Sequence, residues 1–198
     1  VMIDQQGNAT ITTKQQLSGN FSEQILTVKN KFDEREQRDF LNRNSSISGL
    51  IVKDYQIAIS NEDSLSKSEI TYSGVVQKFS QATAKRIVLK AFMGKLSPDH
   101  LLNKSLRQVD EYEIQLPEPW LLEGSFPEVN LNEENMSGFL TVSLEGNMLK
   151  VRREINLTLK EKLEKDQETE LLRKINSAFD RTILFSKSSL SLTHTPTL

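Results

Sequence analysis

The sequence predicts a mainly β protein of the α+β class, with antiparallel, sandwich-like sheets, two short early helices and one long C-terminal helix packed on a sheet. Three observations support this class. Several segments alternate apolar and polar residues with the period of two that a half-buried strand requires. Residues 21–41 and 163–179 instead repeat their apolar residues at helical spacing. Gly146-Asn147 separates two alternating runs, which is typical of a two-residue hairpin turn.

The first elements expected are a strand and two helices. Residues 9–17, which lie between Gly7 and Gly19, alternate in the way that predicts a half-buried strand, with one side of the chain apolar and the other polar. The apolar positions of the first helix are Phe21, Ile25 and Val28. The second helix has Phe32, Glu36 and Phe40 on one face. Its many charged residues indicate a solvated surface, with Glu34 and Arg38 spaced to form an ion pair.

Strands dominate the next part of the chain. Residues 49–60 predict a strand with one apolar side, formed by Ile51, Tyr55, Ile57 and Ile59. Residues 61–69 are polar and predict a loop. Residues 70–94 predict two more strands, broken near 80–84, and residues 95–105 predict a loop or a single helical turn.

The C-terminal part predicts a hairpin, a helix and a closing strand. Residues 136–159 alternate on both sides of Gly146-Asn147. The apolar positions of the helix are Leu163, Leu171, Leu172, Ile175, Ala178 and Phe179. The run "TILF" that ends at Phe185 predicts a final strand, so the helix would cover one sheet face.

Strand content resumes near Arg107, which suggests a division into two parts. We expect a β-rich subdomain with two short helices at 1–108, and the hairpin, helix and closing strand at 109–186. Residues 187–198 would form a tail. The alternative is one continuous domain over residues 3–186.

Composition limits the class of protein. The 198 residues are 36% hydrophobic and 26% charged, as in soluble globular proteins. The net charge is −2 and basic residues are interleaved with acidic ones, so no nucleic-acid partner is expected. There is no cysteine, which excludes disulfides, thiolate metal sites and a cysteine nucleophile within this chain. No membrane span and no signal peptide are seen, and we expect the chain to be cut from a longer protein.

The sequence predicts no catalytic residue, metal ligand or cofactor. No glycine-rich nucleotide motif occurs, and the histidines number only two, His100 and His194. His100 follows Ser97 and Asp99, but a catalytic triad is normally assembled from separate segments. A hydrolase built on these three residues is therefore the weakest of the functions considered.

One stretch, residues 111–128, stands out by its prolines and the single tryptophan. Pro117 ends a strand that contains Tyr112, and Trp120 follows. Trp120 has two interpretations. It either fills the core at a corner of the chain or forms an exposed platform for a sugar or peptide. Trp120 and Tyr112 are the candidate binding residues.

The order of these motifs resembles a known family. Arg107 begins "RQVDEYEIQLP", followed by Trp120, Pro127, the run "GFLTVSLEGNMLKVRREINL" and a helix ending in "FDRTILF". This order resembles the β-rich C-terminal domain of transglutaminase-like proteins of Gram-negative bacteria. "IDQQGNATITTKQQLSGNFSEQ" is similar to the segment that joins the papain-like core to that domain. The resemblance spans roughly residues 3–186.

The resemblance implies a non-catalytic accessory domain of an exported protein, in the periplasm or at the cell envelope. Such a domain would support or gate a preceding transglutaminase-like core, a hydrolase or acyltransferase acting on peptide or isopeptide bonds. The family's nucleophile has no counterpart here, because the chain has no cysteine. The alternative is a stand-alone envelope module that binds glycan or peptide through Trp120 and Tyr112.

Overall fold

The computed structural model describes residues 1–62, 65–91, 94–101, 105–117 and 120–187. It is about 50% strand and 24% helix, with three α-helices and two sheets in which antiparallel pairing prevails among the described residues. The predicted α+β class, mainly β, is therefore confirmed.

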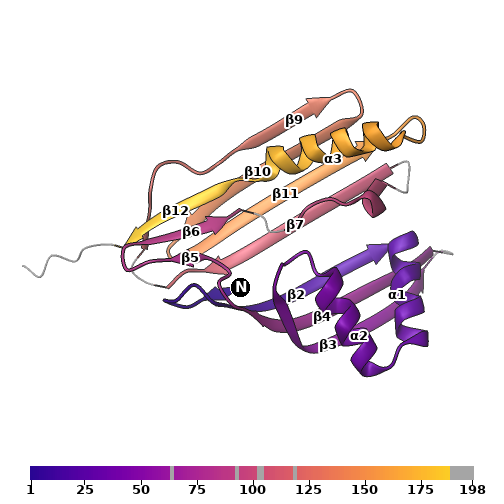
Figure 1. Ribbon diagram of the computed structural model, residues 1–198, viewed down its shortest axis with the longest axis horizontal. Coiled ribbons are helices and arrows are strands. Elements are labelled where there is room, and N and C mark those ends of the chain that lie inside the picture. The colour runs from indigo at the N-terminus through magenta and orange to yellow at the C-terminus, as the bar shows by residue number, and fades with distance from the viewer. Residues whose placement is uncertain (63–64, 92–93, 102–104, 118–119, 188–198) are drawn as a thin grey trace, which may run out of the picture.

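Eight strands form one long sheet in the order β3-β4-β2-β1-β7-β11-β10-β9. Their bounds are β1 Met2–Ile3, β2 Ala9–Ser18, β3 Leu50–Glu62, β4 Leu65–Val76, β7 Ser105–Gln115, β9 Val129–Glu133, β10 Met136–Glu145 and β11 Met148–Thr158. The short strand β1 joins the N-terminal group of strands to the C-terminal group (Figure 1). Met2 pairs antiparallel with Thr10 of β2 and parallel with Gln115 of β7.

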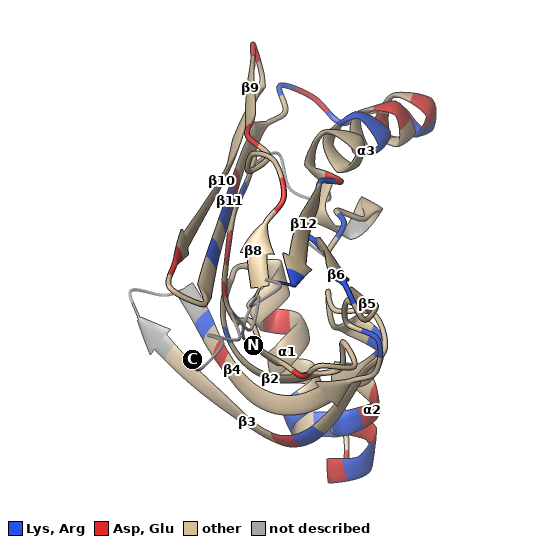
Figure 2. Ribbon diagram, turned by 90° about the vertical axis from the view of Figure 1, so that its left-hand side faces the viewer, with Lys and Arg blue, Asp and Glu red and all other residues tan. Residues whose placement is uncertain are grey.

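A second, four-stranded sheet has the order β5-β6-β12-β8. Its strands are β5 Gln81–Ala82, β6 Arg86–Lys90, β8 Trp120–Leu122 and β12 Thr182–Lys187. The long sheet bends, and the small sheet lies inside the bend (Figure 2). One hydrophobic core joins the two sheets, since Ile87 and Phe185 belong to the same buried cluster as Ile114 and Leu149.

The two early helices form as predicted, with one difference. α1 spans Asn20–Lys31 and contacts β2 and β4, whereas α2 spans Glu34–Asn44 and contacts β3. Phe32 was expected in the second helix, but it caps the C-terminus of α1. In a capping box, the backbone N–H groups of Asp33 and Glu36 each donate to the other residue's side-chain carboxylate. Asp33 is therefore the N-cap, and α2 begins at Glu34.

The long helix α3, Lys165–Phe179, packs on the long sheet as predicted (Figure 1). Its buried face consists of Leu172, Ile175 and Phe179. The helix approaches β10 closely at Gly138, where an added Cβ would lie 2.9 Å from the Phe179 ring. The absence of a side chain at Gly138 therefore permits this packing.

The hairpin prediction is confirmed. Glu145 of β10 pairs with Met148 of β11, which leaves Gly146 and Asn147 as the two turn residues. Gly146 has φ +62°, and such turns require a positive φ. The expected turn at 95–105 is the 3-10 helix η1, Pro98–Leu101, and the expected closing strand is β12.

Two strand predictions were wrong in detail. Ile51 was placed on the buried side of its strand, yet it is 49% exposed, whereas Val52 is buried. A β-bulge between Val52 and Asp54 adds a residue and reverses the alternation, so the half-buried Tyr55, Ile57 and Ile59 share one side of the strand without Ile51. The polar loop at 61–69 was also wrong in part, because β4 already begins at Leu65 and pairs with both neighbouring strands.

The division near residue 108 stays a prediction. Residue 108 lies within β7, and the small sheet pairs β6, which precedes this position, with β12, which follows it. Of the predicted tail, Lys187 ends β12, and residues 188–198 lie outside the described residues.

Candidate functional site

A row of four side chains crosses the outer face of the long sheet where its two groups of strands meet. Met2 and Ile51 at its ends are apolar and exposed, and between them lie Thr10, which presents a methyl group beside its hydroxyl, and the half-buried Val75. Ile51 pairs with Val75, Val75 with Thr10, and Thr10 with Met2, so the four side chains share one face on adjacent strands. Met2 is 57% exposed and Ile51 49% exposed. At the usual strand spacing this apolar row is about 15 Å long. Exposed apolar side chains brought onto one face in this way make the row a candidate surface for a protein contact.

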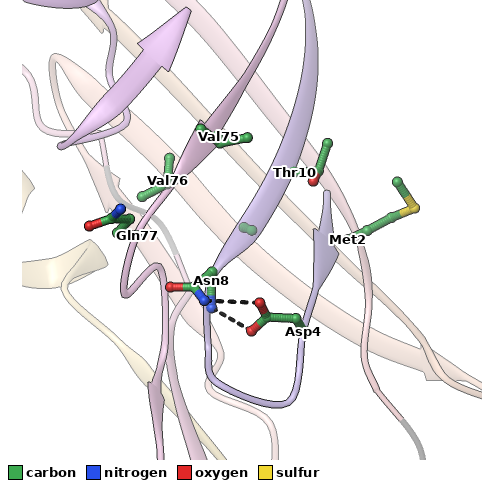
Figure 3. Close-up of a pocket in the computed structure, with 8 residues that line it drawn as sticks. Met2, Asp4, Asn8, Thr10, Val75, Val76 and Gln77 are labelled. Atoms are coloured by element: carbon green, nitrogen blue, oxygen red, sulfur yellow. Dashed lines mark hydrogen bonds between the residues drawn. The ribbon is translucent and has the colours of Figure 1, made fainter.

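An open hollow of about 340 Å³ adjoins the apolar row. Met2, Thr10 and Val75 contribute to its apolar wall, and Asp4, Asn8 and Gln77 contribute polar groups (Figure 3). The Asp4 carboxylate accepts hydrogen bonds from the Asn8 side chain at 2.9 Å and from the backbone N–H of Gln6 at 2.8 Å. These bonds, the Asn8 side chain foremost, hold the pKa of Asp4 below its usual value. Asp4 is thus already engaged in shaping the turn between β1 and β2.

Hydrogen bonds join two turns beside this hollow. The backbone N–H of Ser80 donates to the Gly7 carbonyl at 3.0 Å. The backbone N–H of Lys78 donates to the Asn8 side chain at 3.2 Å. Gly7 has φ +85°, and an added Cβ would lie 2.5 Å from the Ser80 carbonyl oxygen. These contacts hold the two turns that border the hollow and the apolar row in place relative to each other.

Trp120, the first candidate from the sequence, lies at the start of β8. Leu122 pairs with the fully buried Phe185, and Trp120 shares its side of the strand with Leu122. Leu121, on the opposite side, is 57% exposed. The Trp120 side chain is half-buried against the core, and its Nε1 is enclosed with no hydrogen-bond partner among the described residues. This placement corresponds to the core-filling interpretation.

Tyr112, the second candidate, lies in β7 of the other sheet. Burial is the main cause that raises the pKa of Tyr112 to about 12, and the Asp110 carboxylate adds to it. Its hydroxyl hydrogen-bonds with Ser46. The structure thus places Tyr112 and Trp120 in different sheets, and Tyr112 is part of a partly buried polar cluster.

The centre of that polar cluster is Arg153, which sequence reasoning did not single out as a site. Arg153 is 2% exposed, and its Nε and Nη2 donate to the Asp110 carboxylate at 2.9 Å and 2.6 Å. Its Nη1 donates to the Gly94 carbonyl at 2.9 Å, and its guanidinium lies over the Phe179 ring at 5.7 Å. A signal was available, because Arg153 occupies an inward position between Val151 and Ile155 on its strand.

Ser97 and His100 do form a hydrogen bond. The Ser97 hydroxyl lies 2.9 Å from His100 Nδ1, but the Ser97 backbone N–H also donates to that nitrogen at 3.1 Å. The contact closes the turn at η1, where the His100 ring also packs beside Phe21. The side chain of Asp99 lies outside what the structure describes. These contacts give the residues a local structural role, and the absence of catalysis stays a prediction.

Neither a metal-binding cluster nor a spanning helix occurs in the described part of the chain. Over residues 1–62, 65–91, 94–101, 105–117 and 120–187, no group of three His, Asp or Glu residues could hold a metal ion. Among the described helices, none is long and apolar enough to cross a membrane.

The structure is a mainly β domain of the α+β class, with two exposed apolar side chains, Met2 and Ile51, in the apolar row on its long sheet. Comparisons with protein-family models, with curated proteins and with solved structures each returned no match.

Proposed function

We propose that this chain is a non-catalytic accessory domain that packs, through the apolar row, against a transglutaminase-like core and supports or gates that core. The resemblance of residues 3–186 to the C-terminal domains of such proteins suggests the partner. The observation that carries the proposal is the apolar row itself, with Met2 57% and Ile51 49% exposed on one face.

The row is suited to a protein partner. Burying a whole Met, Val or Ile side chain stabilises an association by about 1.5–3 kcal/mol. Met2 and Ile51 keep about half of their surface in water. Each therefore still has about 1 kcal/mol to contribute. Thr10 and Val75 lie between them and complete a continuous surface.

The chemistry of the row favours a protein over a glycan. Sugars are recognised through stacking on exposed aromatic rings, whereas the apolar row is aliphatic. Trp120, the residue on which the glycan alternative depended, turns its ring to the core side of the small sheet. The geometry therefore favours packing against a folded neighbour.

The position of β1 supports a partner that precedes this domain. Met2 belongs both to β1 and to the apolar row. A core attached before β1, as the resemblance implies, would lie directly beside the row. Because β1 also pairs with β2 and β7, a partner held there would contact both groups of strands.

The proposal places the protein in the periplasm or at the cell envelope, where the resembling proteins act. Gating would mean that the core and this domain share an interface at the edge of the core's substrate path. A change in that interface would then alter substrate access without any reacting group in this chain.

The first test is the reading frame of the gene. It should encode a cysteine-bearing domain before Val1, and a frame without one would refute the proposal. The second test is peroxide oxidation of Met2 in the full-length product, because sulfoxide formation follows exposure. We expect Met2 to be oxidised as slowly as the buried Met136, which is 4% exposed.

A matched pair of variants isolates the contribution of the row. Met2→Ser with Ile51→Ser removes two apolar side chains from the row, and Leu121→Ser with Leu184→Ser removes two from the outer face of the small sheet. Only the first pair should increase proteolysis between the two domains. Equal effects of the two pairs would contradict docking at the row.

A further inference from the structure

The strand β3 is an edge strand of unusual length for this molecule. It lies at one end of the long sheet and spans 13 residues, Leu50–Glu62. The other described edge strands are β9 with 5 residues, β8 with 3 and β5 with 2. β3 therefore presents the longest line of backbone N–H and C=O groups that no neighbouring strand in the described sheets satisfies.

Natural proteins protect such edges, and in β3 the protecting features lie towards its two ends, where Lys53 and Asp54 stand near the start and Glu62 is the last residue. The bulge between Val52 and Asp54, together with the charge of Lys53, disfavours pairing near the start of the strand. From Tyr55 to Ser60 the sequence "YQIAIS" has no charge, proline or glycine. A segment of this composition on an open edge readily pairs with another strand.

The alternation of apolar and exposed side chains along β3 specifies what kind of strand would pair with it. Tyr55, Ile57 and Ile59 are half-buried on the side that α2 partly covers. Gln56 and Ala58 are exposed on the outer face. A complementary strand needs apolar residues on the first side and small polar ones on the second, and this segment itself meets that requirement.

We propose that β3 pairs antiparallel with β3 of a second copy of this chain, about a twofold axis at Ile57. In that register Ile57 opposes its own copy and Tyr55 opposes Ile59, so apolar side chains meet on one face. Gln56 opposes Ala58 on the other face, and Asp54 opposes Ser60. No like charges face each other, and the two long sheets join into one. The interface uses the sheet edge, so the apolar row on the face stays accessible.

The dimer has a direct test in solution. In sedimentation equilibrium, the weight-average mass of the chain should rise with concentration from 22.6 kDa towards twice that value. Gln56→Lys with Ala58→Lys places cations opposite cations across the twofold axis. This double variant should therefore remain at 22.6 kDa. Both side chains are exposed, so circular dichroism and melting should be unchanged.

A matched control uses the other edge of the same sheet. Asn130→Lys with Asn132→Lys adds two lysines at the same spacing on β9, where both side chains are also exposed. This control should associate like the unmodified chain. If it abolishes the dimer while the β3 variant does not, the interface lies elsewhere and the proposal is overturned.

Disulfide trapping tests the register, because the chain contains no cysteine of its own. Directly opposed residues of an antiparallel pair lie about 4.5–5.5 Å apart at Cα, within the range that a disulfide spans. Ile57→Cys should therefore form a cross-linked dimer on mild oxidation, whereas Thr12→Cys on the interior strand β2 should not. Cross-linking at Ala58→Cys instead would overturn the register. A mass of 22.6 kDa at the highest soluble concentration would overturn the dimer.

Discussion

Removing one partner of the buried ion pair between Arg153 and Asp110 is expected to lower the unfolding free energy substantially, because the other charge stays behind without its counter-charge. In Arg153→Met the apolar stem stays, but the Gly94 carbonyl loses its Arg153 donor and the Asp110 carboxylate loses its cation. Asp110 keeps the hydrogen bonds that the Gln108 side-chain amide donates to it. Removing one partner of a buried pair costs about 3–5 kcal/mol. The side chain of Asp110 is 21% exposed, so water as well as the Gln108 amide can solvate the carboxylate that has lost its cation. We therefore expect Arg153→Met to lower the unfolding free energy by an amount near the lower end of that range, about 3 kcal/mol.

The assay is urea unfolding followed by fluorescence, since Trp120 is the single tryptophan and lies against the core. Arg152 supplies a matched control one residue away. Its side chain is 44% exposed on the opposite face, where it pairs with Glu111 and Glu154. Exposed pairs are worth roughly 0–1 kcal/mol, so Arg152→Met should change the unfolding free energy by no more than that.

A double-mutant cycle with Asp110→Asn separates the pair from its surroundings. Once Asp110 is neutral, Arg153→Met no longer leaves a carboxylate without its cation. The unfolding free energies lost in the two single variants should therefore sum to more than the loss in the double variant. The reasoning is refuted if Arg153→Met costs no more than Arg152→Met, or if the cycle shows no coupling.

Three further predictions concern the turn at Gly7, Tyr112 and Trp120. Gly7 has a positive φ, and an added Cβ would overlap the Ser80 carbonyl. Gly7→Ala should therefore lower the unfolding free energy by about 2–4 kcal/mol through left-handed strain plus overlap. Gly124 has φ +81° but nothing within 4 Å of an added Cβ. In the same urea assay Gly124→Ala should lose about 1–2 kcal/mol, from left-handed strain alone. Because the pKa of Tyr112 is raised to about 12, the folded state holds its proton longer than the unfolded state, so stability should fall from about pH 10 to pH 12. In Tyr112→Phe the stability should fall less over this pH range. The difference in tyrosinate absorbance between the unmodified protein and Tyr112→Phe reports on Tyr112 alone, and it should titrate near pH 12. Trp120 should emit at shorter wavelength than in the unfolded chain and resist iodide quenching, whereas a red-shifted, quenchable signal would mean an exposed ring.

Much of the secondary structure could be predicted because it depends on neighbouring residues. The hairpin at Gly146-Asn147 and the helix ending at Phe179 are encoded by alternation, turn chemistry and helical spacing within a few positions. The errors arose where pairing between distant strands overrode the local pattern. Leu65 begins β4 inside a polar segment, because its pairing with Glu62 of β3, and the pairing of β4 with β2 from Lys67 onward, stabilise an extended backbone there.

The candidate site was less predictable. Met2, Thr10, Val75 and Ile51 come from four strands, and no spacing in the sequence places them in one row. The bulge after Val52 was needed to expose Ile51, and a bulge has no simple sequence signature. Tyr112 and Trp120 were identified as notable residues, but their environments depended on which sheet each strand joined.

The sequence by itself determined the mainly β class, the three helices, the hairpin and the absence of a cysteine nucleophile. Those properties follow from composition and from interactions within a few residues of the chain. The tertiary structure alone decided that β1 joins the two strand groups, that Arg153 is buried against Asp110, and that β3 forms an open edge. Each of these depends on free energy gained by residues far apart in sequence, through burial and backbone pairing that no local pattern specifies.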